Sequence, residues 1–187
     1  MTRAPAHIEL RGDAHETIAS KSAKQLPHET GGVLLGYREG RNIVVTHALP
    51  VDGQAGTNRY VRDDVRANEL LEEFLAGRAD DDPTGYIGEW HSHPTPSGPS
   101  PTDVAAMRAI AKSSADPVAL LVYAPGRTNP FIGLVTQRHR LGRITSTKAE
   151  VSFPASRFAP LGRLPDGAVR GESPVFISYR QSDGTSH

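Results

Sequence analysis

The chain of 187 residues contains no cysteine. This absence excludes disulfide bonds, a thiolate nucleophile, iron–sulfur clusters and zinc sites built from cysteine. Any metal site must therefore be formed by histidine, aspartate or glutamate side chains. The chain also lacks an excess of charge of either sign, because 21 Lys and Arg residues balance 21 Asp and Glu residues and no long basic run occurs. We therefore expect no nucleic acid partner.

Long apolar runs are absent as well. The longest, from Val118 to Ala124, is far shorter than the ~20 residues that a transmembrane helix needs, so we expect no membrane partner. The N-terminal segment lacks the apolar stretch of a secretory signal. Together these features predict a cytoplasmic protein. The length fits one domain with a short appendage.

The hydrophobic pattern predicts a mixture of helices and strands. Helices are expected where a cap residue or apolar residues at helical spacing occur: 13–25, 63–77 and a segment that begins at Ser100. Strands are expected where β-branched and apolar residues gather: 32–37, 42–47, 86–93, 118–124, 131–137 and 141–153. The first two strands would form a hairpin. The order of the elements predicts an α/β fold with about three helices around one sheet.

The strongest chemical signal is the pair His91 and His93, followed by Asp103. Side chains alternate along a strand, so both imidazoles point to the same face. The nine residues between His93 and Asp103 can bring the carboxylate back to them from the first turn of the next helix. Two imidazoles and one carboxylate form a zinc site that leaves one position open for water, as catalytic zinc centres do. The pattern predicts zinc-dependent hydrolysis.

A hydrolytic zinc centre also needs a base that accepts the proton of water. Glu29 is the candidate, because it comes just before the strand that begins at Gly32. The paired glycines at the start of that strand allow close approach of another backbone. Glu29 alone would carry little weight without the histidine pair.

Taken together, these segments resemble the JAB/MPN metalloprotease family with its JAMM motif, over about residues 7–150. The residues that match the motif are Glu29, His91, His93, Ser100 and Asp103. The resemblance implies that the histidines and the aspartate bind zinc, that the glutamate is the general acid/base, and that the serine stabilises the tetrahedral intermediate. The interval from the second histidine to the serine is one residue shorter than in the commonest motif. The implied fold is a curved mixed sheet flanked by helices, most similar to the prokaryotic branch.

Simpler structural roles stay open for several side chains. Ser100 and Asp103 can form a helix cap, which is compatible with catalysis. Glu89 shares the strand face of the two histidines and is either a partner that orients a metal ligand or an ordinary strand carboxylate. Trp90 faces the opposite side and is expected in the core. The remaining histidines lack partner spacing and are expected to face solvent: His7, His15, His28, His47, His139 and His187.

The composition changes after Phe153, where prolines, glycines and arginines interrupt regular structure. We expect a metalloprotease domain over 1–153, a Pro/Gly-rich linker over 154–174 and a tail over 175–187. The tail resembles the opening strand and loop of a TIR domain but is too short to form one. We favour a native protein that continues into such a domain over a chance match. A TIR continuation would favour a role in defence or signalling.

The resemblance implies hydrolysis of a peptide or isopeptide bond at the C-terminus of a ubiquitin-like protein, either to mature that protein or to remove it from a conjugate. One alternative is release of an amino acid from a small sulfur-carrier protein in biosynthesis. Another is a non-catalytic scaffold, although the complete set of ligands and base argues against it. We expect the substrate to bind as an extended chain between the segment 95–99 and the loop 53–60.

Overall fold

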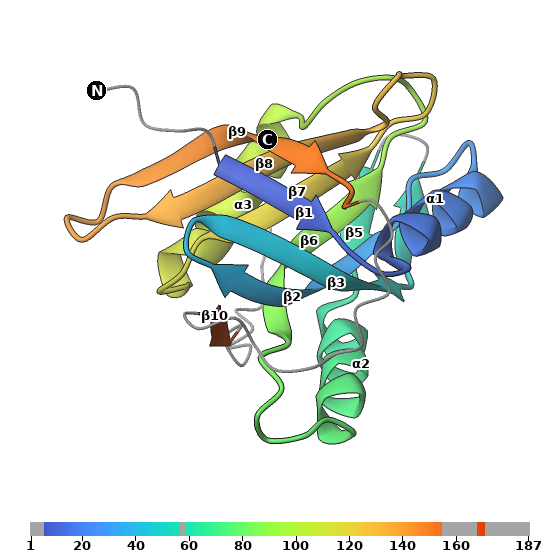
Figure 1. Ribbon diagram of the computed structural model, residues 1–187. Coiled ribbons are helices and arrows are strands. Elements are labelled where there is room, and N and C mark those ends of the chain that lie inside the picture. The colour runs from blue at the N-terminus through green and yellow to red at the C-terminus, as the bar shows by residue number, and fades with distance from the viewer. Residues whose placement is uncertain (1–5, 57–58, 155–167, 171–187) are drawn as a thin grey trace, which may run out of the picture.

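The fold comes from a computed structural model that describes residues 6–56, 59–154 and 168–170 (Figure 1). Three helices occur in these ranges, each within a residue of its expected start: α1 (Ala14–Gln25), α2 (Asp64–Ala76) and α3 (Pro101–Ser113). The start of α2 is fixed by the carboxylate of Asp63, which accepts a hydrogen bond of 3.0 Å from the Arg66 amide.

The expected strands are also present, with somewhat different bounds. They are β2 (Gly31–Glu39), β3 (Asn42–Val51), β6 (Gly85–Ser92), β7 (Val118–Tyr123), β8 (Phe131–Arg138) and β9 (Ile144–Ser152). Four strands were not expected from the sequence: β1 (Ala6–Leu10), β4 (Gly53–Gly56), β5 (Arg59–Arg62) and β10 (Ala168–Arg170). Two of these, β4 and β5, form a hairpin over the segment that was predicted to be a loop beside the substrate.

The main sheet closes on itself. Its strands follow the order β10-β2-β3-β1-β9-β8-β7-β6, and β6 also pairs with β2, so the seven strands from β2 to β6 form a ring. One edge of β2 is shared, because β6 pairs with Gly31–Gly36 and β10 pairs with Tyr37–Glu39. The sheet is mixed: β1 runs parallel to both its neighbours, and β6 runs parallel to β7. A curved mixed sheet flanked by helices is confirmed.

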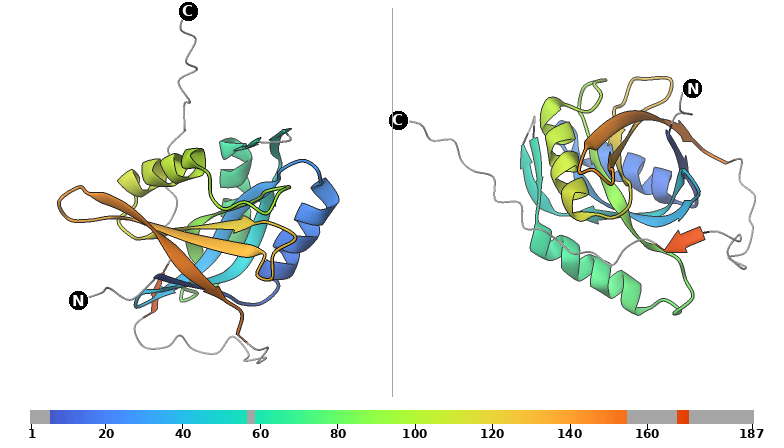
Figure 2. Two further views of the ribbon diagram at one scale, coloured as in Figure 1. Left: turned by 90° about the horizontal axis from the view of Figure 1, so that it is seen from above. Right: turned by 90° about the vertical axis from the view of Figure 1, so that its left-hand side faces the viewer.

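Three apolar clusters hold the layers together. Inside the curve of the sheet, α1 contributes Ala14 and Ile18 to a core that includes Trp90. Figure 2 shows α1 enclosed by the strands, whereas α2, α3 and the β4–β5 hairpin lie on the outer side. There α2 packs Leu71 onto β2 and β3, and α3 packs Met107 onto β7 and β8. The expected place of Trp90 in the core is confirmed, since its exposure is 1%.

Close approach of β2 and its neighbours depends on Gly32. A Cβ atom at this position would lie 1.9 Å from the carbonyl oxygen of Leu49 on β3 and 2.9 Å from Nε1 of Trp90 on β6. Any side chain would therefore force the strands apart. The paired glycines expected to admit another backbone do so on both edges of β2.

Several expectations about the remaining residues need comment. His47 was expected to face solvent, but it is half-buried and packs against the ring of Phe74 at a centroid distance of 4.8 Å. Within the predicted linker, β10 forms three antiparallel pairs with β2. The predicted tail 175–187 lies outside the described residues. Among the described helices, none has the length and apolar character needed to cross a membrane.

Candidate metal centre

The two histidines reach the site from the end of β6. His91 lies in the strand, where it pairs with Gly31 of β2 on one side and Val122 of β7 on the other. His93 follows the strand, and its amide donates a hydrogen bond of 2.8 Å to the carbonyl oxygen of Tyr123. Both backbones are thus held by neighbouring strands, and the alternation of side chains directs both imidazoles to the outer face.

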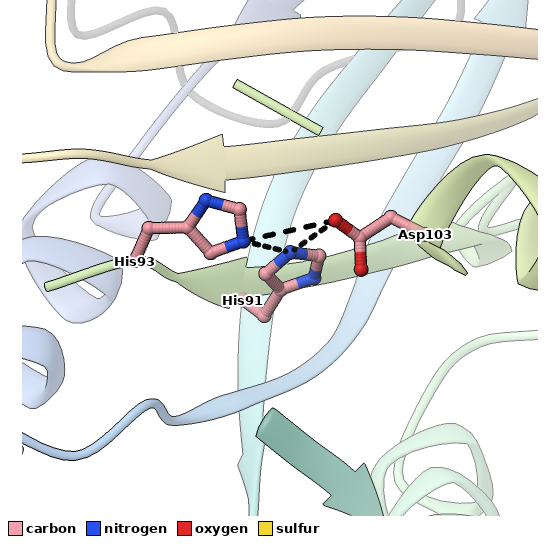
Figure 3. A group of neighbouring side chains, drawn as sticks. All are labelled: His91, His93 and Asp103. Carbon is pink, nitrogen blue, oxygen red and sulfur yellow. Dashed lines mark hydrogen bonds and ion pairs between the residues drawn. The ribbon is translucent and has the colours of Figure 1, made fainter. Parts of the chain in front are cut away.

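The aspartate reaches the site from the first turn of α3. The Nε2 atoms of His91 and His93 lie 3.1 Å apart, and Oδ2 of Asp103 lies 3.5 Å from the first and 3.7 Å from the second (Figure 3). The three ligand atoms lie within 4.8 Å of one another. The structure therefore brings together the three residues that the sequence predicted as metal ligands.

The orientation of His93 favours metal binding through Nε2. Its Nδ1 lies 3.0 Å from the hydroxyl of Ser97 and 3.3 Å from the carbonyl oxygen of the same residue. We infer that Nδ1 carries the proton, because a carbonyl oxygen only accepts hydrogen bonds. The lone pair of Nε2 then faces another imidazole nitrogen and a carboxylate oxygen. A cation bound between these three atoms would be coordinated by the Nε2 lone pair and the carboxylate together.

The protonation states also suit a cation site. Burial, followed by the nearby charge of His91, lowers the pKa of His93 below its ordinary value, so the imidazole is neutral at pH 7. For Asp103, burial is the largest single effect and would raise the pKa. Hydrogen bonding and charge from His91, together with hydrogen bonds from Ser100, outweigh it and hold the pKa of Asp103 at about 2.

Glu29 also lies at the site. Its side chain is buried, and Oε1 lies 4.0 Å from Nε2 of His93. The position follows from strand register, because Glu29 stands two residues before Gly31, the partner of His91. The carboxylate that the sequence singled out as a base is therefore beside the ligand cluster.

Ser100 joins the site through Asp103. The amide of Ser100 donates to Oδ2 of Asp103 at 2.6 Å, and the amide of Asp103 donates to Oγ of Ser100 at 3.2 Å. This reciprocal pair is a capping box at the start of α3. Ser100 thus caps the helix and orients the carboxylate. The capping role left open by the sequence is confirmed.

Sequence reasoning missed two serines that hold the ligands in place. Ser92, between the histidines, is 1% exposed; its amide donates to the carbonyl oxygen of Thr30 at 2.7 Å, and its hydroxyl accepts from the Thr30 amide at 3.0 Å. It therefore ties the segment that follows Glu29 to the histidine strand. Ser97 contacts His93, as described above. The alternation of side chains along the strand places Ser92 on the face opposite the histidines. This pattern could have predicted from the sequence that Ser92 is buried.

Of the two roles left open for Glu89, the structure favours that of a strand carboxylate that does not contact a metal ligand. Its Oε1 receives a hydrogen bond from Arg62 at the end of β5 and lies 3.3 Å from the hydroxyl of Tyr86. The carboxylate shares the histidine face but is directed toward the β4–β5 hairpin. Among the described contacts, its partners are these two side chains and neither histidine.

The cluster has the features of a metal centre with room for chemistry. Two imidazoles and one carboxylate oxygen supply three ligands, and a buried carboxylate stands next to them. Three protein ligands leave a coordination position for water, which distinguishes catalytic from structural sites. The residues present therefore fit a catalytic metal ion.

Comparisons with known proteins agree with this site. Residues 12–137, more than half of the chain, match the family described as prokaryotic homologues of the JAB domain. The chain is 31% identical over 140 residues to the probable metalloprotease y4qB of Sinorhizobium fredii. This alignment covers 66% of this chain and 82% of that protein.

The fold is also similar to that of a solved structure. The solution structure of protein DSY2949 from Desulfitobacterium hafniense matches with a TM-score of 0.54 and covers 78% of this chain and 93% of that chain. At 18% identity, this likeness concerns the fold alone. The family match and the metalloprotease relative support a metal-dependent hydrolase, and the chain belongs to the prokaryotic JAB family.

Proposed function

We propose that this protein is a zinc-dependent hydrolase that cleaves a peptide or isopeptide bond at the C-terminus of a ubiquitin-like protein. One observation carries the proposal: the Nε2 atoms of His91 and His93 and Oδ2 of Asp103 converge, with Glu29 Oε1 at 4.0 Å from His93. Imidazole and carboxylate ligands suit zinc, and a three-ligand set is typical of hydrolytic zinc sites. A zinc ion bound there would acidify a water molecule and polarise the scissile carbonyl group.

Glu29 is the general acid/base in this proposal. Its carboxylate would accept the proton of the attacking water and return it to the leaving amine. Glu29 is buried beside the ligand cluster, two residues before a strand that pairs on both edges, which limits the movement of its carboxylate. Ser100 would donate its hydroxyl proton to the oxygen that becomes charged in the transition state, since its Oγ accepts from Asp103 and its proton stays available.

The substrate class rests on the resemblance to JAMM proteases. The metal-ligand cluster lies at the end of β6, on the outer face beside the start of α3, and we propose that an extended chain approaches it there. We propose that the segment 95–99 and the β4–β5 hairpin form the walls of a narrow channel for the last residues of the substrate. A narrow channel would favour a small residue just before the cleaved bond.

Two variants test the chemistry. His91→Ala should bind less zinc, measured by elemental analysis, because one of three ligands is lost. Glu29→Gln should keep its zinc and lose nearly all hydrolysis, because an amide of similar shape cannot accept the proton. Zinc retained at full stoichiometry in His91→Ala, or normal turnover in Glu29→Gln, would refute the assignment.

A substrate panel tests the proposed class. The panel joins ubiquitin-like proteins and small sulfur-carrier proteins to a reporter or an amino acid through their C-terminal carboxyl group. Cleavage of ubiquitin-like fusions supports the proposal, and cleavage of sulfur-carrier fusions alone favours a role in biosynthesis. If zinc binds but no member of the panel is cleaved, the proposed substrate class is wrong.

A further inference from the structure

A partly buried ion-pair network connects the β4–β5 hairpin to the strand that carries the histidines. Arg62, the last residue of β5, has a side-chain exposure of 13%. Its Nη1 donates to Oε1 of Glu89 on β6, and its Nε and Nη2 both donate to Oδ1 of Asp64, at 3.0 and 2.7 Å. Asp64 is the first residue of α2. One guanidinium group thus joins β5, α2 and β6.

The β6 end of this network is fixed by an irregularity in the strand. Pairing of β6 with β2 shifts register between Leu34 and Leu35, which places one extra residue on β6 between Tyr86 and Gly88. The bulge brings Tyr86 and Glu89 to the same face, where the Tyr86 hydroxyl lies 3.3 Å from Oε1 of Glu89. Tyr86 packs against the apolar clusters under both α2 and α3. The carboxylate therefore has a rigid support two residues before His91.

The hairpin, by contrast, has no strand partner in the main sheet over its described residues. In the described part of the chain, β4 and β5 pair only with each other, in a two-stranded sheet separate from the main one. Arg62 lies at the base of this hairpin, where it pairs with Gly53. A planar guanidinium with two carboxylate partners fixes direction as well as distance, which a single point charge does not. Arg62 therefore gives the base of the hairpin a defined direction and distance relative to β6.

We propose that Arg62 is a positioning residue that acts through Glu89 to hold the β4–β5 hairpin beside the metal-ligand strand, so that the hairpin forms one wall of the substrate channel. The part of this inference that concerns substrate rests on the proposed function. The network of Arg62, Asp64 and Glu89 includes none of the three metal ligands. Its loss should therefore weaken substrate binding while the metal and the chemical step are preserved.

The test compares Arg62→Gln with Arg66→Gln. Arg66 lies four residues further along, is 45% exposed and pairs with Glu69 of its own helix, so it is a matched control. Because removing one partner leaves a buried charge, the double variant Arg62→Gln/Glu89→Gln is included to remove both. Arg62→Lys keeps the charge but lacks the planar group that fixes the direction of both contacts, so its effects should be intermediate.

Amide hydrogen exchange is the first measurement, because it does not depend on activity. In Arg62→Gln and in the double variant, exchange of the amides in 53–56 and 59–62 should accelerate, while those of β6 and α3 stay protected. Arg66→Gln should match the wild type. Unchanged exchange in the hairpin of the double variant would overturn the positioning role of Arg62.

Steady-state kinetics is the second measurement, on the fusion that the wild type cleaves best and on a short peptide of its last residues. For the fusion, KM should rise about tenfold in Arg62→Gln, with similar kcat and unchanged zinc content. A loss of kcat or zinc at unchanged KM would overturn the channel-wall role. If the wild type cleaves no substrate, the proposed function fails and the channel wall with it, whereas the exchange result still decides whether Arg62 positions the hairpin.

Discussion

Replacement of Ser100 by alanine would separate the capping role that the structure shows for this side chain from the catalytic role that we propose for it. The amide of Asp103 donates to Oγ of Ser100 at 3.2 Å, and the amide of Ser100 donates to Oδ2 of Asp103 at 2.6 Å. Ser100→Ala deletes only the first of these hydrogen bonds. The second involves the backbone of residue 100 and survives, so the carboxylate of Asp103 stays oriented toward the histidines.

The size of each effect follows from this difference. Loss of a serine cap lowers the free energy of unfolding by about 1 kcal/mol. For a domain of this size, that loss lowers Tm by roughly 2–4 °C. Metal content should stay the same, because all three ligands remain. If the hydroxyl also donates to the oxygen that becomes charged in the transition state, kcat should fall by about 10²-fold.

Thermal unfolding, zinc content and turnover of the same preparation provide the assay. Asp63→Ala is the control, because Asp63 caps α2 through its own carboxylate and lies outside the ligand cluster. It should lower Tm without changing kcat. A Ser100→Ala protein with an unchanged Tm would refute the capping argument. One with a lower Tm and normal kcat would leave Ser100 as a cap alone, and one that loses zinc would show that the cap is needed to hold Asp103.

Three further predictions concern the channel, the core and a buried histidine. A fusion substrate with Gly, Ala or Leu before the cleaved bond should be hydrolysed at least about tenfold more slowly with Leu than with Gly if the channel is narrow, since that residue would have to enter it; equal rates for all three would exclude a narrow channel. Leu71→Ala should lower the free energy of unfolding in denaturant by about 2–5 kcal/mol, because Leu71 is fully buried between α2 and the sheet. The kcat of this variant should stay unchanged well below Tm. Burial and the charge of Arg78 lower the pKa of His47, although Asp13 and Asp82 oppose this shift. The folded state then binds fewer protons than the unfolded state, so stability should decrease as pH falls through the unfolded pKa of about 6.5, and His47→Gln should flatten this dependence.

The helices and the buried strands were predictable because their signals are local. Apolar residues at helical spacing define α2, and the capping box at Ser100 defines the start of α3. The strand β7 is apolar along its whole length, as expected for a strand covered on both faces. These segments carry their structural preference within a few residues of sequence.

The missed strands depend on partners that are distant in the sequence. In β1, Ile8 and Leu10 are buried while His7 and Glu9 are not, so an alternating pattern exists but spans only five residues. It becomes a strand because β3 and β9 flank it on both sides. The hairpin of β4 and β5 has strands of four residues, too short for a pattern. Ring closure between β2 and β6 likewise has no local signal.

The same distinction between local signals and distant partners applies to the residues of the site. The ligand set was predictable because the spacing of His91, His93 and Asp103 reflects a strand, a loop and a helix start. Glu29 was a candidate from its position just before the strand that begins with paired glycines, and the resemblance added the weight that this position lacked, since its proximity to His93 depends on pairing between β2 and β6. The direction of the Glu89 side chain was not predictable, because alternation gives the face of a strand but not the partner, here Arg62, that a carboxylate finds on that face.

Closure of the strand ring also determines when a folding chain becomes able to hydrolyse its substrate. The metal ligands lie within one short segment, from β6 to the first turn of α3, so a single local loop brings them together. Glu29 arrives only when β2 pairs with β6, a contact whose anchoring residues, Thr30 and Ser92, are 62 positions apart. Contacts so distant in sequence cost more chain entropy and form late. By this reasoning a partly folded chain can bring its proposed metal ligands together before Glu29, the proposed base, reaches them, so metal binding would precede hydrolytic competence.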